Sequence, residues 1–359
     1  MTPLICFYQN EKYIFSTQYR RLVCPPDQKT LDFLTAVGVQ NADQMKIVQL
    51  NFECLDVSSR KTLYESPSAQ IFVLDKYELV SEAEMFQRLP DEKIEIDSWK
   101  LFESAESFKQ KVNLSREAIA KGRLYQVNLT TGLRSTTANS AAAIFKSFFQ
   151  RFKGHYKAFL PLAQVEAICF SPEMFLEKRN GTLRTCPIKG SIANDRSFEV
   201  DLLQNKKEEA ELSMIVDLLR NDLNRVEENQ SATVTQHRAH MSLGYIQHTY
   251  SEIEIKTDRA LPEILENTYP GGSISGCPKT ESLKLISELE PVARQIYTGS
   301  IGWWYRGDFT LNLAIRTFIK TPSELFYQAG CGIVYDSNAD DEWNEFLIKT
   351  GSLQETAPQ

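Results

Sequence analysis

The chain has 359 residues, of which 42% are hydrophobic and 24% charged, so it is an ordinary globular protein, long enough for one large domain or two smaller ones. A formal net charge of −7 argues against nucleic-acid binding that depends on neutralising phosphates, and an anionic substrate would need a local cationic pocket or a metal. The seven cysteines form no CxxC pair, which disfavours a disulfide framework and a zinc knuckle. The first residues lack a signal-peptide pattern, and no apolar run approaches the ~20 residues of a membrane span. We therefore expect a cytoplasmic protein that binds neither membrane nor nucleic acid.

The secondary-structure pattern mixes strands and helices without regular βαβ alternation. Residues 1 to about 95 alternate short strand-like runs with turns. Helices are predicted over residues 104–121, 138–152, about 199–226, 280–289 and about 339–350. Later strands are predicted over residues 124–131, 232–236, 245–255, 299–305, 310–319 and 324–330. This mixture favours an α+β fold with largely antiparallel sheets.

An Asn180-Gly181 pair lies between two apolar-rich runs, which is the strongest short-range signal for a β-hairpin. If these two residues form the loop, the numbers of cross-strand partners sum to 361. Lys189 then faces the residue before Glu173, so Glu173 and Lys189 become near neighbours. An acid and an amine held together in this way are a candidate catalytic pair, although a surface ion pair would have the same spacing.

Two helices each carry glutamates three residues apart: Glu208 with Glu211, and Glu342 with Glu345. With this spacing the two carboxylates share one helix face, and Glu211 projects on the side of apolar residues. Inward carboxylates need a neutralising partner, and oxygen ligands favour Mg²⁺ over zinc. The pairs thus predict a magnesium site, with solvated helix faces as the alternative. Lys349 adds a cation four residues after Glu345.

The segment 270–280 looks like a phosphate-binding loop of the form GxxxxGK[ST]. It departs from that motif because Cys277 and Pro278 separate the second glycine from Lys279. A glycine-rich turn that enters a helix still offers backbone amides to an anion such as a carboxylate. A nucleotide-binding module is the alternative. His248 can be either a core or a pocket residue.

A set of ordered segments carries a resemblance to a known family. They are GRLYQVNLT (122–130), FSPEMFL (170–176), PIKGS (187–191), ELSMIVDLLRNDLNRV (211–226), HTYSEI (248–253), YPGGSISGCPK (269–279), YTGSIGWW (297–304), LNLAIRT (311–317) and AGCGIVYDSNADDEWNEFLIK (329–349). In this order they resemble the chorismate-utilising enzymes. The resemblance implies a large two-sheet, mostly antiparallel α/β sandwich with helices outside. Residues 1–100 would contribute strands to the same sandwich, and residues 101–355 would form the chorismate-binding catalytic region.

Two positions sort this family by nucleophile. Relatives that add water to chorismate carry a lysine base where this chain has Gln126, and anthranilate synthases usually have alanine where it has Lys189. The resemblance is therefore greatest to component I of aminodeoxychorismate synthases, which serve 4-aminobenzoate and folate biosynthesis. It implies that Lys189 attacks C2 of chorismate, that Glu173 is the general acid/base, and that ammonia enters at C4. The alternative is component I of an anthranilate synthase, with Lys189 incidental.

The same resemblance assigns binding roles. Mg²⁺ would be held by Glu211 and Glu345, with Glu208 and Glu342 in support. The ring carboxylate of chorismate would meet the metal together with Lys349, Gly330 and Gly332. Arg316 and Tyr297 would hold the enolpyruvyl carboxylate, and the remaining pocket-lining residues would be His248, Ser275 and Gln126. No glutaminase signature is apparent, so ammonia would come from a glutamine amidotransferase subunit.

Overall fold

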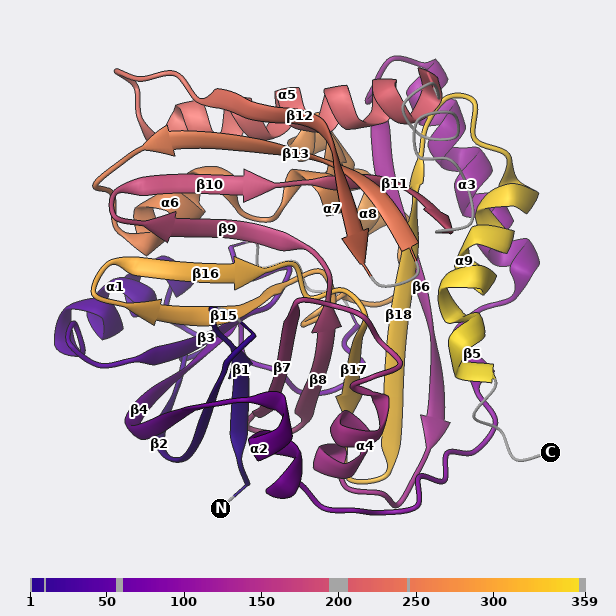
Figure 1. The fold of residues 1–359 in the computed structure, drawn as a ribbon. Coiled ribbons are helices and arrows are strands. Elements are labelled where there is room, and N and C mark those ends of the chain that lie inside the picture. The colour runs from indigo at the N-terminus through magenta and orange to yellow at the C-terminus, as the bar shows by residue number, and fades with distance from the viewer. Residues whose placement is uncertain (1, 10, 56–60, 194–205, 244–245, 355–359) are drawn as a thin grey trace.

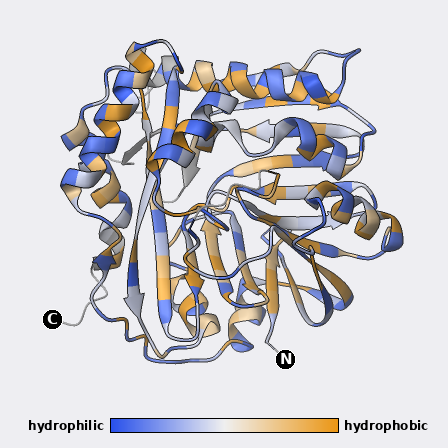
Figure 2. Cartoon of the chain, turned by 180° about the vertical axis from the view of Figure 1, so that it is seen from behind, coloured by the Kyte–Doolittle hydropathy of each residue, from blue (hydrophilic) through white to orange (hydrophobic). Residues whose placement is uncertain are grey.

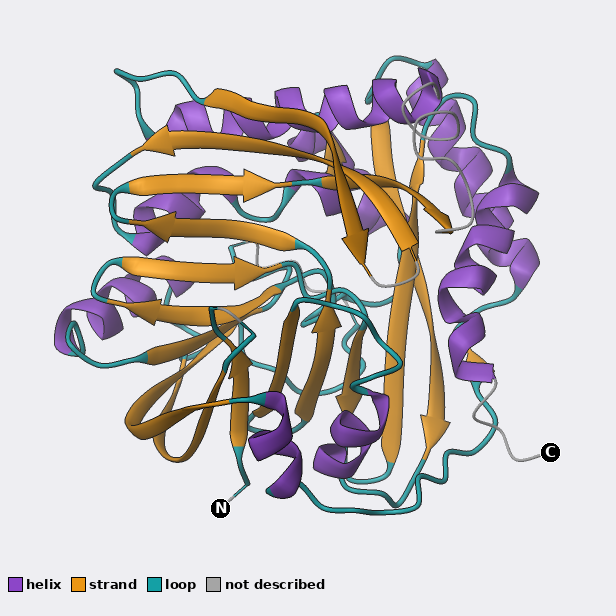
Figure 3. Cartoon of the chain, viewed as in Figure 1, coloured by secondary structure: helices purple, strands orange, loops and turns teal. Residues whose placement is uncertain are grey.

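The computed structural model describes residues 2–9, 11–55, 61–193, 206–243 and 246–354. All described strands pair antiparallel and form one continuous hydrogen-bonded sheet, which bends into two groups of strands that run across one another (Figures 1 and 3). In hydrogen-bonded order the strands are β12 (Thr233–Leu243), β13 (Ile246–Lys256), β10 (Thr182–Cys186) and β11 (Ile188–Ala193), β9 (Met174–Arg179), β16 (Asp308–Asn312), β15 (Ser300–Tyr305), β3 (Lys46–Leu50), β4 (Ala69–Val80), β2 (Tyr13–Val23), β1 (Leu4–Phe7), β7 (Tyr156–Pro161), β8 (Glu166–Ser171), β17 (Thr317–Lys320), β18 (Glu324–Ile333), β6 (Gln126–Thr136), and β5 (Lys100–Leu101) with β14 (Gly276–Cys277). The predicted α+β class with antiparallel pairing is confirmed.

The helices lie outside the sheet. They are α1 (Thr30–Gln40), α2 (Glu82–Gln87), α3 (Ala105–Ala120), α4 (Ala141–Phe148), α5 (Lys206–Val226), α6 (Leu261–Thr268), α7 (Gly272–Ser275), α8 (Lys279–Leu289) and α9 (Ala339–Gln354). Figure 2 shows hydrophobic and hydrophilic residues mixed along the longer helices, as expected for helices with one face on the sheet and one in solvent. The four residues of α7 are all buried. Among the described residues, none of the helices is both long and apolar enough to cross a membrane.

Helix α1 lies in the region predicted to contain only strands and turns, so that prediction is wrong there. The helix buries Thr30, Phe33, Leu34 and Val37, a spacing of three, one and three residues that is typical of one helix face. Helices α3, α4, α8 and α9 were predicted within a few residues. Helix α2, which lies in the same region as α1, and helices α6 and α7 were not predicted. For the long helix, the structure describes residues 206–226, and the predicted first turns over residues 199–205 lie outside the described residues.

Helix α3 shows how the local sequence and the core act together. The Ser104 side chain accepts a hydrogen bond from the backbone N–H of Ser107 at 3.2 Å and so caps the helix start. Phe108 then packs in the interface with α9, with its ring centroid 5.6 Å from that of Trp343 and 6.0 Å from that of Phe346. Figure 1 shows α3 and α9 side by side next to β18 and β6.

The predicted hairpin forms, but its register holds for only part of its length. Asn180 and Gly181 both have positive φ, at 48° and 74°, and their neighbours pair with numbers that sum to 361. A bulge between Arg184 and Cys186 then shifts the register. Beyond it, β11 pairs with β13, so that Lys189 lies opposite Thr249 and not opposite the residue before Glu173. The predicted cross-strand opposition is therefore wrong.

The strand predicted over residues 310–319 is in fact two strands, β16 and β17. β16 pairs with β9 while β17 pairs with β8, and the chain between β8 and β9 is interrupted at the same level. The two interruptions bond to each other: Leu313 N–H donates to the Glu173 carbonyl at 3.1 Å, and Phe170 N–H donates to the Arg316 carbonyl at 3.0 Å. The backbone of Arg316 has a positive φ of 50°. Glu173 and Arg316 thus lie where the sheet changes direction.

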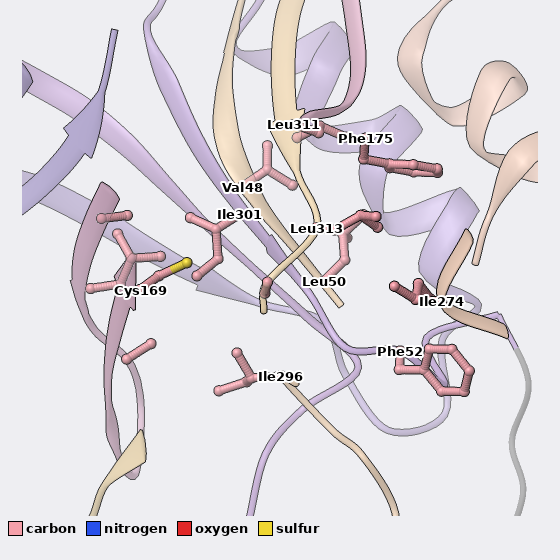
Figure 4. Close-up of a cluster of buried hydrophobic side chains, with 14 of the residues drawn as sticks. Val48, Leu50, Phe52, Cys169, Phe175, Ile274, Ile296, Ile301, Leu311 and Leu313 are labelled. Carbon is pink, nitrogen blue, oxygen red and sulfur yellow. The ribbon is translucent and has the colours of Figure 1, made fainter. Parts of the chain in front are cut away.

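The two ends of the chain share one hydrophobic core. In Figure 4, Val48 and Leu50 of β3 lie in one cluster with Phe175 of β9, Ile274 of α7 and Ile301 of β15. Side chains of this size contribute about 1.5–3 kcal/mol each when they are fully buried. The described strands among the first hundred residues therefore belong to the same sheet and core as the rest of the described chain.

A buried ion pair ties the site region to the N-terminal segment. Both carboxylate oxygens of Glu290 accept hydrogen bonds from the Arg294 guanidinium, which also donates to the carbonyls of Ile274 at 2.8 Å and Asn128 at 2.6 Å. The Glu53 carboxylate accepts the backbone N–H of Arg294 at 2.8 Å. One guanidinium thus joins β6, α7 and the loop after α8.

Replacing Arg294 with methionine should destabilise the protein. The change takes the guanidinium away from the buried Glu290 carboxylate, and the loss of one partner of a buried pair costs about 3–5 kcal/mol. Urea unfolding followed by circular dichroism measures the effect. R259M is the matched control, because Arg259 forms an exposed pair with Glu263 at the same i,i+4 spacing. Equal midpoint shifts for the two variants would contradict the expectation.

Candidate functional site

Glu173 lies at the interruption between β8 and β9 and is only 8% exposed. Its backbone is fixed by Leu313, as described above, and by the Ser171 hydroxyl, which accepts the Glu173 N–H at 3.1 Å. Its carboxylate Oε1 accepts a hydrogen bond from the Ser273 hydroxyl at 3.1 Å. Segments from β8, β9, α7 and the β16–β17 connection therefore hold one carboxyl group in place.

Burial and charge act against each other on this carboxyl group. Burial raises the pKa of Glu173, while Lys189, the Ser273 hydroxyl, Lys349 and Arg316 lower it by a smaller amount, so the net pKa is raised. Three cations from distant parts of the sequence thus lie close enough to act on one acid. A carboxyl group with a raised pKa can keep its proton to donate it, which is the property required of a general acid.

Lys189 and His248 lie on the paired strands β11 and β13. Lys189 is half-buried and opposite Thr249, whereas His248 is buried at 5% exposure and lies opposite Ser191. The structure therefore brings Lys189 near Glu173 through the β11–β13 pairing and not through the hairpin register that the sequence suggested.

Arg316 and Tyr297 are connected through Tyr327, which interacts electrostatically with both of them. The charge of Arg316 acts on both Glu173 and Tyr327, and burial raises the pKa of Tyr327 to about 12 despite that charge. Burial likewise raises the pKa of Tyr297, and Tyr327 adds to this effect. Tyr327 on β18 was missed by the sequence analysis, because only the pairing of β17 with β18 brings it near Arg316.

The glutamates of α9 lie together but are unequally buried. Glu342 is 6% exposed, whereas the Glu345 side chain is 48% exposed and pairs with Lys349 at 2.6 Å. Lys349 also donates to the Gly330 carbonyl at 2.7 Å. Burial alone would lower the pKa of Lys349, but the neighbouring Cys331, Glu345 and Glu342 side chains outweigh this effect and the pKa is raised. The cation that the sequence placed four residues after Glu345 thus forms an ion pair with it.

The glutamates of α5 are less well defined. Glu211 is half-buried beside the buried Leu212 and Ile215, so it lies at the margin of the apolar face and does not point fully inward. The side chain of Glu208 lies outside the described side chains. Figure 1 shows the start of α5 and the first turns of α9 at the same corner of the molecule. Among the described contacts, none joins Glu211 to the glutamates of α9.

The side chains around α9 fit a hard divalent cation. One ligand atom each from Cys331, Glu342 and Glu345 lie within 4.8 Å of one another. Burial raises the pKa of the Cys331 thiol, which donates to the Glu342 carbonyl at 3.3 Å and so stays protonated. Two carboxylates without a thiolate suit Mg²⁺ better than zinc.

Gln126, Gly330 and Gly332 meet on the paired strands β6 and β18. A Cβ atom on Gly332 would lie only 2.7 Å from Nε2 of Gln126, so any larger residue would make the Gln126 amide shift. Gln126 is 1% exposed, and its Oε1 has no hydrogen-bond partner among the described residues. A buried acceptor of this kind can take a hydrogen bond from a ligand.

The glycine-rich segment does not form a phosphate loop. Gly276 pairs with Val127 of β6, and Lys279 is tied to Asp222 at 2.7 Å and to the Thr268 carbonyl at 2.8 Å. The Ser275 hydroxyl donates to the Gly271 carbonyl at 2.8 Å and is fully buried. The nucleotide-binding alternative therefore has no support in the geometry.

A surface depression of about 570 Å³ lies away from all of these groups. It is lined by Glu95, Asp97, residues 136–139, Pro322 and Ser323, none of which was predicted to be functional.

Comparison with known proteins adds to this geometry. Residues 11–355 match a family described as chorismate binding enzyme. The chain is 34% identical over 258 residues to aminodeoxychorismate synthase component 1 of Bacillus subtilis, which covers 69% of this chain and 55% of that protein. It is 31% identical over 277 residues to anthranilate synthase component 1 of Aquifex aeolicus, which covers 75% of this chain and 56% of that protein. The chain thus spans about half the length of the curated relatives it matches.

Solved structures show the same fold. Anthranilate synthase component I from Streptococcus pneumoniae matches with a TM-score of 0.80 at 24% identity, covering 99% of this chain and 91% of that one. The menaquinone-specific isochorismate synthase MenF from Escherichia coli matches with a TM-score of 0.78 at 18% identity, covering 100% and 89%.

Glu173→Gln should stabilise the protein increasingly as the pH rises. Because the folded-state pKa of Glu173 is raised, the folded protein holds more protons than the unfolded chain from about pH 4.5 upward, so its unfolding free energy falls through that window. Glutamine does not titrate and removes this loss. Urea midpoints at pH 5 and pH 8 measure it, with E228Q at an exposed position as the control. An equal gain at both pH values would contradict the expectation.

Proposed function

The chain belongs to the chorismate binding enzyme family, and on that basis we propose that it converts chorismate and ammonia to 4-amino-4-deoxychorismate. The observation that carries this proposal is the buried Glu173 carboxyl group, whose pKa is raised by burial and on which the nearby Lys189 charge acts. An amine nucleophile beside an acid is what substitution of a ring hydroxyl requires.

The proposed chemistry has two substitutions. The neutral Lys189 amine attacks C2 of chorismate, the two ring double bonds shift, and the C4 hydroxyl leaves with a proton from Glu173. Ammonia then attacks C4, the double bonds shift back, and the Lys189 amine is expelled from C2. An amine attacks through its lone pair, so Lys189 must be unprotonated at the moment of attack.

The substrate carboxylates require cations. Arg316 offers paired donors to the enolpyruvyl carboxylate, and Tyr297 is connected to Arg316 through Tyr327. The ring carboxylate would meet Lys349 beside Gly330 and Gly332. The other residues that we propose to line the site are His248, Ser275 and Gln126.

The proposed Mg²⁺ would be held by Glu342 and Glu345, together with Glu211 and Glu208 of α5. When bound, it would neutralise the ring carboxylate and the glutamates together. The residues of this chain then orient the substrate, with Glu173 on the side of the departing hydroxyl.

Synthesis of anthranilate is the second candidate function. Relatives with that name match at almost the same identity as aminodeoxychorismate synthases, which supports keeping it. In that reaction Lys189 would have no covalent role.

Lys189→Ala separates the two candidates. In the presence of chorismate, Mg²⁺ and ammonium, we expect aminodeoxychorismate formation to fall by at least about 100-fold, because the nucleophile is lost. Product masses and chorismate binding are measured in parallel. K256A, an exposed lysine on the neighbouring strand β13, should keep the wild-type rate. Wild-type aminodeoxychorismate formation by K189A would refute the covalent mechanism, and anthranilate as the wild-type product would favour the second candidate.

A separate glutamine amidotransferase subunit is the proposed source of ammonia. The purified chain should therefore form product with ammonium salts but not with glutamine alone. Addition of an unrelated purified glutaminase to the glutamine reaction should restore product, because it releases ammonia. Product formation from glutamine without a second protein would show that the chain needs no such partner.

A further inference from the structure

We propose that Lys349 serves as a built-in counter-ion for Glu345 in the ligand-free protein and must leave it before a divalent cation binds. The substrate carboxylate then receives the released ammonium, so that metal and substrate bind cooperatively. This inference rests on the Mg²⁺ site of the proposed function and adds the order of events at that site.

The contacts of Lys349 carry the first step. Its Nζ lies 2.6 Å from Oε1 of Glu345 and donates to the Gly330 carbonyl at 2.7 Å. The same Glu345 carboxylate lies within 4.8 Å of a carboxylate oxygen of Glu342. The ammonium thus sits against an oxygen that a metal would use.

The charges carry the second step. Mg²⁺ binds carboxylate oxygens at about 2.0–2.1 Å, so an ion on Oε1 of Glu345 would lie within about 5 Å of the ammonium. Charges of +2 and +1 at that distance repel strongly enough, even in water, to weaken metal binding by about tenfold or more. The Glu345 carboxylate therefore cannot bind the Lys349 ammonium and Mg²⁺ together as tightly as it would bind either one alone.

The exposure and length of the Lys349 side chain carry the third step. The side chain is 44% exposed, and its partner is one turn away on the same helix. A lysine amine on a flexible four-carbon stem can reach a different anion without any movement of the helix backbone. Because Gly330 offers only a neutral carbonyl, the released ammonium needs an anion nearby, and a substrate carboxylate beside Gly330 and Gly332 supplies one.

The last step follows from thermodynamic linkage, which makes the effects of metal and substrate on each other's affinity equal. If the substrate carboxylate draws Lys349 away from Glu345, it increases the affinity for metal, and the metal must increase the affinity for substrate by the same factor. A surface ion pair without a role would show no such coupling.

The decisive measurement is Mg²⁺ binding to the substrate-free protein, by calorimetry or by competition with Mn²⁺ observed by electron paramagnetic resonance. K349M should bind Mg²⁺ about tenfold more tightly than the wild type. K349R keeps a cation and should resemble the wild type. K284M, which breaks the exposed pair between Lys284 and Glu281, is the matched control and should also leave the affinity unchanged. General damage to the fold would weaken binding and not tighten it.

Equal or weaker Mg²⁺ binding by K349M, or no measurable binding by either protein, would overturn the proposal. In a second arm, chorismate should tighten Mg²⁺ binding more in the wild type than in K349M, and an equal enhancement would also overturn it. The first arm uses no chorismate, so its result stands whether or not the protein makes aminodeoxychorismate. Failure of product formation would refute the proposed function separately.

Discussion

Two neighbouring strand interruptions that are bonded to each other are the constraint on which the rest of the structure depends. β8 and β9 are separated by one interruption, and β16 and β17 by another. The Leu313 N–H donates to Glu173 across the two interruptions, and the Phe170 N–H at the end of β8 donates to Arg316. Neither segment can straighten into a continuous strand without leaving buried peptide groups unpaired, which is costly. Glu173 and Arg316 are therefore fixed where the sheet turns, and the site exists because the sheet cannot continue there.

The local charge around this junction is positive, whereas the net charge of the whole chain is negative. The chain carries a net charge of −7, yet Lys189, Lys349 and Arg316 all act on the single buried carboxyl of Glu173. The excess of positive charge at this point suits an anionic substrate, while the glutamates of α9 suit a cation beside it. Arg294 also stabilises this arrangement, because its guanidinium donates to backbone carbonyls of α7 and β6.

Sequence reasoning succeeded where the determining contacts are local. The turn at Asn180 and Gly181 and the pairing of Glu345 with Lys349 involve residues close in the chain, and both are present. It failed where the structure depends on pairing between segments that lie far apart in the sequence. The bulge after Arg184 and the split of the 310–319 strand depend on pairing with β13, β8 and β9. Ser273 and Tyr327 carry no local signal of their place in the site. The chemical roles came from the family resemblance and not from spacing.

The strand order also has a consequence for synthesis of the chain. Leu50 of β3 pairs with Ser300 of β15, and Ile5 of β1 pairs with Phe159 of β7. At about 5–20 residues per second, a ribosome would leave one edge of β3 without its partner for roughly tens of seconds. During that interval the apolar residues of β3 are open to other nascent chains. Translation speed and chaperone supply should therefore govern how much active protein a cell recovers from this sequence.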